Sequence, residues 1–99
     1  MLHDELDIEL GAIRVKLGGG DNGHNGLKSI RKSLATGDWY RIRLGIGRPP
    51  GLQDPADFVL RNFSASEQTM VTDLIESGVA ATKSLILTSL TETQNRFNS

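Results

Sequence analysis

Two segments in the first half of the chain alternate between apolar and polar side chains. One is GAIRVKL, residues 11–17, and the other is WYRIRLGIG, residues 39–47. A period of two residues is typical of a β-strand with one buried face. We therefore predict two strands whose apolar side chains point inward: Ile13, Val15, Leu17, Tyr40, Ile42, Leu44 and Ile46. Their basic side chains are predicted to point outward: Arg14, Lys16, Arg41 and Arg43.

The residues between these strands favour a helix. Leu27, Ile30 and Leu34 recur at the spacing of one helical face, and Gly37 marks a stop just beyond them. A strand, a helix and a strand in this order predict a βαβ unit with parallel strands and a right-handed connection. Such a sheet needs cover on both faces and more than two strands. The acidic start LHDELDIEL predicts a turn rather than a central strand, so the sequence indicates part of a domain, or a protomer that completes its sheet with something else.

Two further helices are predicted in the second half of the chain. Asp54 and Pro55 favour the N-cap and first position of a short helix that extends through Leu60. Ser64 and Glu67 have the spacing of a capping box, and apolar residues then recur at the helical period along a longer C-terminal helix. The final residues, TQNRFNS, are expected to fray. The predicted fold class is α/β: a partial mixed or parallel sheet with flanking helices, a βαβ unit, a short helix and a long helix.

Charge is distributed unevenly along the 99 residues, although the net charge is only −1. Residues 1–13 carry −4, residues 14–48 carry eight Lys and Arg against two Asp, which gives +6, and residues 49–99 carry −3. The basic middle block predicts a surface that meets a polyanion, or alternatively an ordinary solvated face. The length supports one domain, residues 1–99, with a single core.

The absence of cysteine excludes disulfides and thiolate metal sites, and it suits a reducing compartment. The acidic start lacks the pattern of a secretory signal, and no apolar run is long enough to cross a bilayer. We therefore expect a cytoplasmic protein with no membrane partner.

The segment KLGGGDNGHNGLKSI, residues 16–30, is rich in glycine. Gly18, Gly20 and Gly23 match the G-x-G-x-x-G pattern of dinucleotide sites, where glycines let backbone amides approach a pyrophosphate. The acidic residue that such a site places at the end of the second strand is missing from LGIGRPP, and no Gly-Lys-Ser/Thr of a P-loop is present. A structural glycine turn and the wall of an active site are the remaining interpretations.

Three polar residues in and before this segment have side chains suited to catalysis. Asn25 can donate and accept hydrogen bonds, His24 can position or relay a proton, and Asp4 in HDELD can orient a histidine or a water. Each also has a plain structural interpretation: Asn25 as a helix N-cap, His24 as a surface loop residue and HDELD as a solvated acidic turn. The His, Asp and Glu residues show no recognised ligand spacing, so no metal site is predicted.

The order HDELDIELGAIRVKLGGGDNGHNGLKSI and then YRIRLGIGRPP resembles the bacterial peptidyl-tRNA hydrolase family. The segments HDELD, GGxxGHNGLKS and RIRxGIGRP carry the resemblance, which continues through DFVLRNFSASEQ to the final helix. It covers essentially all 99 residues, but these correspond to the C-terminal half of the family's single α/β domain.

The resemblance implies hydrolysis of the ester that joins a peptide to the 3′ ribose of tRNA, without a metal or organic cofactor. In the family a His activates the water, an Asp orients that His, and Asn side chains bind the peptide and polarise the carbonyl. By position, Asp4 resembles the orienting carboxylate and Asn25 resembles the Asn of the substrate site, with His24 beside it at the tRNA-facing rim. Lys16 and Arg43 resemble the basic pair that clamps the tRNA 5′ phosphate. The resemblance implies a mobile cleft wall for four glycines: Gly18, Gly19, Gly20 and Gly23.

The family's catalytic His, its Asn-Pro motif and its Met-Asn segment lie upstream of HDELD, and nothing in this sequence replaces them. His3 and His24 are the only imidazoles, and neither matches the family's base. Three hypotheses follow: a hydrolase that is feeble or inactive without its other half or a second chain, a tRNA-binding remnant without catalysis, or a product that does not fold by itself. The full-length family is expected to be monomeric.

Overall fold

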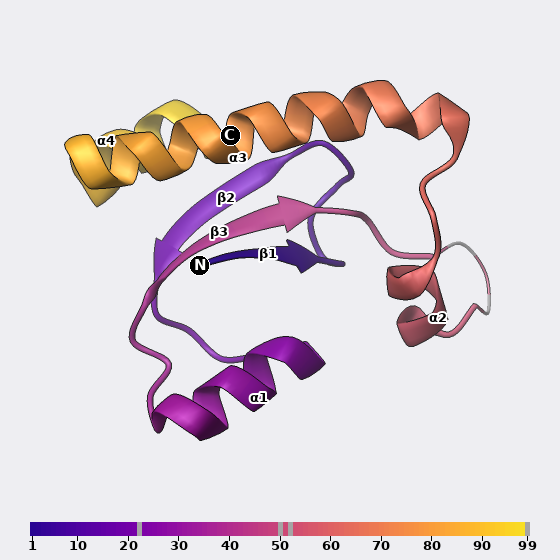
Figure 1. The fold of residues 1–99 in the computed structure, drawn as a ribbon, viewed down its shortest axis with the longest axis horizontal. Coiled ribbons are helices and arrows are strands. Elements are labelled where there is room, and N and C mark those ends of the chain that lie inside the picture. Colours follow the sequence, from indigo (N-terminus) through magenta and orange to yellow (C-terminus); the bar gives the residue numbers. More distant parts are fainter. Residues whose placement is uncertain (22, 50, 52, 99) are drawn as a thin grey trace.

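The computed structural model describes residues 1–21, 23–49, 51 and 53–98. Its centre is a three-stranded sheet in the order β1-β3-β2 (Figure 1). β1 is Leu2–Glu5, β2 is Ile13–Leu17 and β3 is Tyr40–Gly45. β1 runs parallel to the central β3, and β2 runs antiparallel to it. The predicted fold class, α/β with a mixed sheet and flanking helices, is confirmed.

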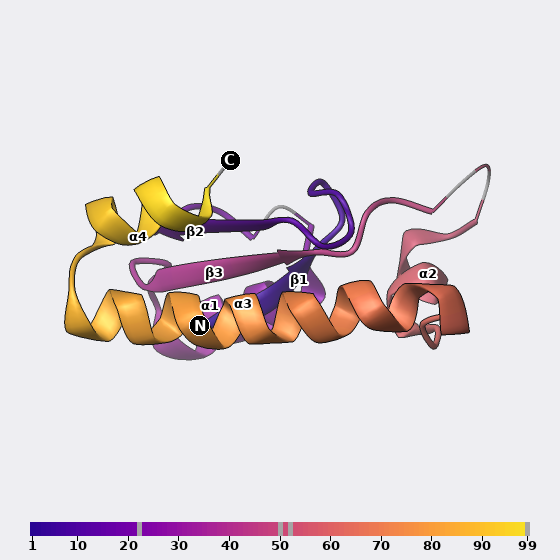
Figure 2. The ribbon, with the colours of Figure 1, turned by 90° about the horizontal axis from the view of Figure 1, so that it is seen from above.

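The described residues also form four α-helices: α1 is Asn25–Leu34, α2 is Pro55–Leu60, α3 is Gln68–Leu87 and α4 is Leu90–Phe97. A 3₁₀ turn, Ala65–Glu67, leads into α3. α3 and α1 lie on opposite sides of the sheet in Figure 1, and Figure 2 shows α4 beside β2. α2 begins as predicted, because the Asp54 carboxylate accepts the Ala56 N–H at 2.8 Å and Pro55 follows the cap.

The predicted parallel βαβ unit is wrong in one respect, since β2 and β3 pair antiparallel. Leu17 at the end of β2 lies opposite Tyr40 at the start of β3. Just beyond this pair, the Gly18 N–H donates to the Trp39 carbonyl at 2.9 Å. The chain therefore leaves and re-enters the sheet at the same end. A connection containing a helix is typical of parallel neighbours, which is why the sequence pattern indicated a crossover.

The sequence predicts no strand at the acidic start, but Leu2–Glu5 forms β1. The Ile42 N–H donates to the Met1 carbonyl at 2.7 Å, and Leu2 lies opposite Ile42 in the parallel register. Asp and Glu are disfavoured in strands, so local preference does not explain β1. Its strand conformation depends on pairing with β3.

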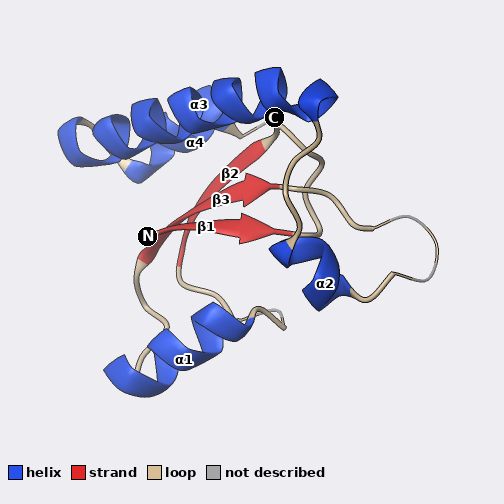
Figure 3. Cartoon of the chain, turned by 45° about the vertical axis from the view of Figure 1, so that its right-hand side comes forward, coloured by secondary structure: helices blue, strands red, loops and turns tan. Residues whose placement is uncertain are grey.

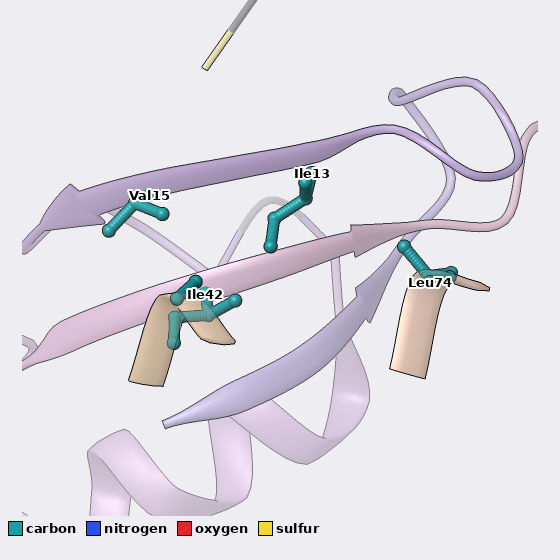
Figure 4. Packing of buried hydrophobic residues seen from close by; sticks show 5 residues of the cluster. Ile13, Val15, Ile42 and Leu74 are labelled. Atoms are coloured by element: carbon teal, nitrogen blue, oxygen red, sulfur yellow. The ribbon is translucent and has the colours of Figure 1, made fainter. Parts of the chain in front are cut away.

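α3 packs on the apolar face of the sheet. The core cluster joins residues of β2, β3 and α3: Ile13, Val15, Ile42, Leu74 and Ala81 (Figure 4). A Cβ atom at Gly78 would stand 3.3 Å from Leu2 and 3.4 Å from Leu44, so glycine lets α3 approach the sheet closely. Two residues predicted to point inward are instead about half exposed, Leu17 at 52% and Tyr40 at 49%. They form the last pair of the β2–β3 ladder.

The C-terminal residues form a helix where the sequence predicts fraying. The hydroxyl groups of Ser84 in α3 and Thr93 in α4 lie 2.6 Å apart, and Thr93 is fully buried. The Val15 N–H donates to the Asn98 side-chain oxygen at 2.6 Å, and the Gln94 amide donates to the Val15 carbonyl at 3.0 Å. Side chains of the C-terminal segment thus satisfy the outer backbone edge of β2 at Val15.

A charged and aromatic corner joins α2 to α3. The predicted capping box is confirmed, with the Ser64 N–H donating to the Glu67 carboxylate at 2.8 Å. Arg61 donates two hydrogen bonds to the same carboxylate at 3.1 and 3.2 Å. Its guanidinium carbon also lies 4.3 Å from the centre of the Phe58 ring. One arginine therefore connects the end of α2 to the start of α3.

Candidate active site

Asp4 and His24 are brought together from distant parts of the sequence. Asp4 lies near the end of β1, and His24 is the N-cap residue of α1. The His24 Nε2 lies 2.8 Å from the Asp4 Oδ1. On the other side of the ring, the His24 Nδ1 accepts the Leu27 N–H at 3.1 Å. Because Nδ1 is an acceptor, the proton of the neutral ring lies on Nε2 and is donated to the carboxylate.

This pair corrects two structural interpretations of the sequence. His24, and not Asn25, caps α1. His24 is also more than a surface loop residue, because its side chain is 23% exposed and bonded at both nitrogens. The Asp4 side chain stays 38% exposed, so a second group can reach its carboxylate. With both ring nitrogens engaged, His24 has no free lone pair with which to take a proton from water.

Asp4 and His24 line a cavity of about 490 Å³, which we call the Asp4 cavity. Asn25, the first residue of α1, and Gly23 line it as well. Four of the predicted site residues therefore share one cavity. Further lining comes from β1 and the loop after it, from Gly26, from the loop after β3 and from the region of α2: Glu5, Leu6, Asp7, Gly26, Arg48, Asp54, Pro55, Ala56, Val59 and Leu60.

His3 is the second imidazole near this cavity. Its Nδ1 lies 2.8 Å from the Asp4 carbonyl oxygen, so Nδ1 carries the proton in the neutral ring. Its Nε2 is buried and has no hydrogen-bond partner among the described residues. Burial lowers the pKa of His3, and the nearby His24 lowers it further. His3 is therefore neutral at physiological pH, but its lone pair is shielded from water in this structure.

Lys16 of β2 and Arg43 of β3 line a second cavity of about 300 Å³, which we call the cationic cavity. Lys16 lies opposite Arg41, and Arg14 lies opposite Arg43, so the four cations project from one face of the sheet. The Arg43 Nη2 lies 3.5 Å from a carboxylate oxygen of Glu5, which lines both cavities. The two cavities are therefore neighbours. The remaining lining residues are His3, Gly20, Leu27 and Arg41.

Arg41 was predicted to point outward, and this prediction is wrong because the residue is only 2% exposed. Its guanidinium donates to the carbonyl groups of Gly19 at 2.8 Å, Gly20 at 2.5 Å and Gly37 at 3.0 Å. It also lies 4.8 Å from the centre of the Trp39 ring. Burial lowers the pKa of Arg41, and the nearby cations add to this effect. Arg41 fixes the glycine segment to the sheet, a role for which the alternating pattern gave no signal.

The four glycines that were predicted to form a cleft wall lie in different places: two line the cavities and two lie at the end of the sheet. Gly20 lines the cationic cavity and Gly23 lines the Asp4 cavity. Gly18 is buried next to β3, with a φ of 72° that favours glycine. Gly19 has a φ of 111°, and a Cβ atom there would stand 2.6 Å from the Lys16 Nζ. The antiparallel β2–β3 pairing also removes the βαβ context on which the dinucleotide interpretation depended.

An ion pair that the sequence did not indicate stands at the Asp4 cavity. The Arg48 Nε donates to the Asp7 carboxylate at 2.7 Å, and both residues line the cavity. The pair joins the loop after β1 to the loop after β3. Within the described ranges, no three His, Cys, Asp or Glu side chains are grouped so as to hold a metal ion. Nor do the described residues include a helix long and apolar enough to span a membrane.

A mixed α/β fold thus places a carboxylate, an imidazole and an amide in one cavity and several cations in the next. The fold and these side chains define an α/β protein with two neighbouring cavities, one lined by Asp4, His24 and Asn25 and the other by Lys16, Arg41 and Arg43. The family model described as peptidyl-tRNA hydrolase matches residues 1–99, and the chain belongs to this family. The resemblance seen in the sequence is confirmed.

Relatives and solved structures agree with this assignment. The peptidyl-tRNA hydrolase of Frankia alni is 53% identical over 98 residues, which cover 99% of this chain and 50% of that protein. The enzyme of the same name from Cutibacterium acnes is 52% identical over 99 residues, covering 100% and 50%. A crystal structure of peptidyl-tRNA hydrolase from Acinetobacter baumannii matches with a TM-score of 0.85 and 34% identity, covering 99% and 50%. The chain spans about half the length of the curated relatives it matches.

Proposed function

We propose that this chain carries part of a site that hydrolyses the ester between a peptide and tRNA in the cytoplasm. The observation that supports the proposal is the grouping of Asp4, His24 and Asn25 in one cavity beside a cavity lined by Lys16 and Arg43. In tRNA the 5′ phosphate and the 3′ ester lie at the same end of the acceptor stem. Adjoining cationic and acid–base cavities therefore suit one substrate molecule.

In the proposed reaction, water adds to the ester carbonyl, and the bond between the carbonyl carbon and the ribose oxygen breaks. An imidazole takes the proton from water and returns it to the leaving ribose oxygen. Asp4 orients that imidazole through the accessible part of its carboxylate. The Asn25 amide donates to the carbonyl oxygen as negative charge develops there. Lys16 and Arg43 hold the 5′ phosphate by charge-assisted hydrogen bonds.

The described residues do not include a free base for this reaction. His24 uses both nitrogens, and the His3 Nε2 is buried. We therefore propose that the base is an imidazole from outside the described residues, which approaches the exposed Asp4 carboxylate. Loss of a general base typically lowers the rate by about 10²- to 10⁴-fold, so feeble hydrolysis is expected of the chain alone.

A second candidate function is tRNA binding without turnover. The occupied nitrogens of His24 and the buried Nε2 of His3 favour it, because the cationic cavity needs neither imidazole. Under this alternative, affinity for tRNA falls steeply with salt and no added base produces Asp4-dependent cleavage.

Imidazole added to the buffer separates the two functions. The measurement is release of N-acetyl-amino acid from N-acetyl-aminoacyl-tRNA by the chain, over a series of imidazole concentrations. We expect imidazole-dependent turnover that Asp4→Asn abolishes and that Asp73→Asn, a change at an exposed α3 residue, leaves intact. Cleavage no faster than imidazole alone would contradict the hydrolase proposal. Saturable, salt-sensitive tRNA binding in the same sample would then support the second function.

A further inference from the structure

Asn25 is followed directly by Gly26, and an Asn-Gly pair is the sequence context in which asparagine loses its side-chain amide most readily. In this reaction the backbone nitrogen of the next residue attacks the side-chain carbonyl carbon, and a glycine has no Cβ atom to hinder the approach. Both residues are exposed. No hydrogen bond among the described residues holds the Asn25 side-chain amide. The pair is therefore open to this chemistry.

The backbone N–H of Gly26 lies in the first turn of α1, where helical acceptors are missing. The first hydrogen bond of the helix runs from the Lys28 N–H to the His24 carbonyl at 3.0 Å. Gly26 comes before this donor, so its N–H has no acceptor within the helix. α1 also lies on the side of the sheet away from α3 and α4, so neither helix covers this turn (Figure 3). The Gly26 nitrogen is thus accessible to hydroxide, which must remove its proton before it can attack.

The position of the His24 ring requires glycine at residue 26. A Cβ atom at Gly26 would stand 2.9 Å from the His24 Cε1 and 3.2 Å from its Nδ1. The ring is bonded to Asp4 through one nitrogen and to Leu27 through the other, so it cannot turn aside without losing these contacts. A larger residue at 26 would slow the chemistry at Asn25 but would displace the cap. The arrangement that caps α1 therefore keeps Asn25 next to glycine.

The His24 cap opposes the reaction, because it holds residue 25 in the helix. Helical residues have a ψ of about −42°, and the five-membered ring of the intermediate cannot close until residue 25 leaves this conformation. Asn25 is the first residue of α1, and helix ends fray. Opening of the first turn breaks the hydrogen bond of 3.1 Å from the Leu27 N–H to the His24 Nδ1. A weaker cap therefore means faster loss of the Asn25 amide.

We propose that Asn25 is a site of spontaneous deamidation and that the His24 cap sets its rate. The deprotonated Gly26 nitrogen forms a bond to the Asn25 Cγ, the bond from Cγ to Nδ2 breaks, and ammonia leaves. The product is a cyclic imide. Water then adds to either carbonyl of the imide and breaks the bond from that carbonyl carbon to the Gly26 nitrogen, which yields aspartate or isoaspartate. The reaction consumes water and needs no enzyme, metal or oxidant.

Deamidation removes the hydrogen-bond donor that the proposed function assigns to Asn25. A carboxylate only accepts hydrogen bonds, so it cannot stabilise negative charge on the ester carbonyl oxygen. It also adds a negative charge to a cavity that Asp4 and Asp7 already line. The isoaspartyl product lengthens the backbone by a methylene group at the start of α1. This consequence rests on the proposed function, whereas deamidation itself does not.

The test is incubation of the chain at mildly alkaline pH, followed by peptide mass spectrometry that separates asparagine, aspartate and isoaspartate at each position. The test protein carries Asn22→Gln, because Asn22 also precedes a glycine and lies outside the described residues. We expect Asn25 to be lost faster than Asn62, an exposed asparagine that precedes Phe63. The rate at Asn25 should rise with pH, and it should rise further in urea, which opens the helix.

Two substitutions of His24 isolate the contribution of the cap. His24→Ala removes the capping side chain and is expected to speed the loss of Asn25 by about 2- to 30-fold, the range that corresponds to the stability a cap supplies. His24→Ser keeps a capping hydroxyl and should leave the rate close to that of the parent chain. The loss of Asn62 in each variant reports any general loosening of the fold.

Loss of Asn25 no faster than that of Asn62, or equal rates of Asn25 loss in His24→Ala and His24→Ser, would overturn the inference. So would a rate in urea no higher than that in the folded chain. Imidazole-dependent turnover is measured on the same samples and should fall in step with the conversion of Asn25. Deamidation that leaves turnover intact contradicts only the role proposed for Asn25. Fresh chain without turnover contradicts only the proposed hydrolase.

Discussion

His24 and Asp4 face each other across the gap between α1 and β1, with the His24 Nε2 2.8 Å from the Asp4 Oδ1. The same ring caps α1 by accepting the Leu27 N–H through Nδ1. One imidazole thus fixes the start of a helix to the strand that carries the candidate orienting carboxylate. The two hydrogen bonds can be separated by substitution, because each uses a different nitrogen.

His24→Ala removes both hydrogen bonds, and loss of the cap is expected to lower the free energy of unfolding by about 0.5–2 kcal/mol. His24→Asn keeps a good capping side chain and loses the contact with Asp4. In urea unfolding, His24→Asn should therefore recover most of the free energy of unfolding that His24→Ala loses. Equal destabilisation by both changes would mean that the cap contributes little.

Arg41→Met is expected to lower the free energy of unfolding by about 1–3 kcal/mol, because three backbone carbonyls lose their buried donor. Arg41→Lys should restore little of this, since a single ammonium cannot reproduce the planar guanidinium contacts. Amide exchange across residues 18–20 should accelerate in both variants. Lys28→Met, at an exposed position on α1, serves as the control. A glycine segment that exchanges at the normal rate in Arg41→Met would refute the anchoring role.

The Glu67 carboxyl has its pKa lowered to about 2, chiefly by the hydrogen bonds from Arg61 and then by those from Ser64. Because the folded pKa lies below the ordinary value of 4.5, the unfolded chain binds more protons at intermediate pH. The stabilisation is complete above about pH 4.5 and is lost as the pH falls toward 2. Thermal unfolding of Glu67→Gln should show a weaker pH dependence in this window than Glu76→Gln, an exposed control on α3. The same pH dependence of thermal unfolding in both variants would contradict the lowered pKa of Glu67.

Lys16→Ala combined with Arg43→Ala should weaken binding to tRNA and flatten its salt dependence. Each lost phosphate contact reduces the slope of log affinity against log salt by about 0.7–0.9. Lys83→Ala combined with Arg96→Ala removes the same charge from α3 and α4, outside both cavities. Filter binding at several salt concentrations measures the tRNA affinity of both double variants and its dependence on salt. The same slope in both double variants would mean that the cationic cavity does not hold phosphate.

Asn25→Ala should lower turnover in the imidazole-supplemented reaction by about 10²-fold or more, as loss of an oxyanion donor does, with tRNA affinity nearly unchanged. Helix stability should change little, since His24 provides the cap. Single-turnover rates and binding constants are measured on the same preparation. Parallel losses of rate and affinity would indicate that Asn25 acts in binding instead of polarising the carbonyl.

The sequence predicted those elements whose side chains repeat with the right period. β2, β3 and the apolar face of α3 are of this kind, and the caps of Asp54 and Ser64 are local signals as well. The antiparallel pairing was not predicted, because strand direction depends on tertiary contacts that alternation does not encode. β1 was missed for the same reason, since its strand conformation depends on β3 and two of its four residues carry acidic side chains.

The candidate site was also predicted in part, and the unpredicted part again depends on tertiary contacts. The motifs placed Asp4, His24 and Asn25 together, and all three line one cavity. The burial of Arg41 could not be read from alternation, because its partners are backbone carbonyls of Gly19, Gly20 and Gly37. Backbone acceptors leave no side-chain pattern in a sequence.

The most direct test of the proposed function is single-turnover hydrolysis of N-acetyl-aminoacyl-tRNA by this chain with imidazole added to the buffer. We predict release of the N-acetyl-amino acid faster than with imidazole alone, which Asp4→Asn abolishes and Asp73→Asn preserves. Release that proceeds equally well in Asp4→Asn would contradict the proposed function, because the proposed reaction requires the Asp4 carboxylate to orient the base.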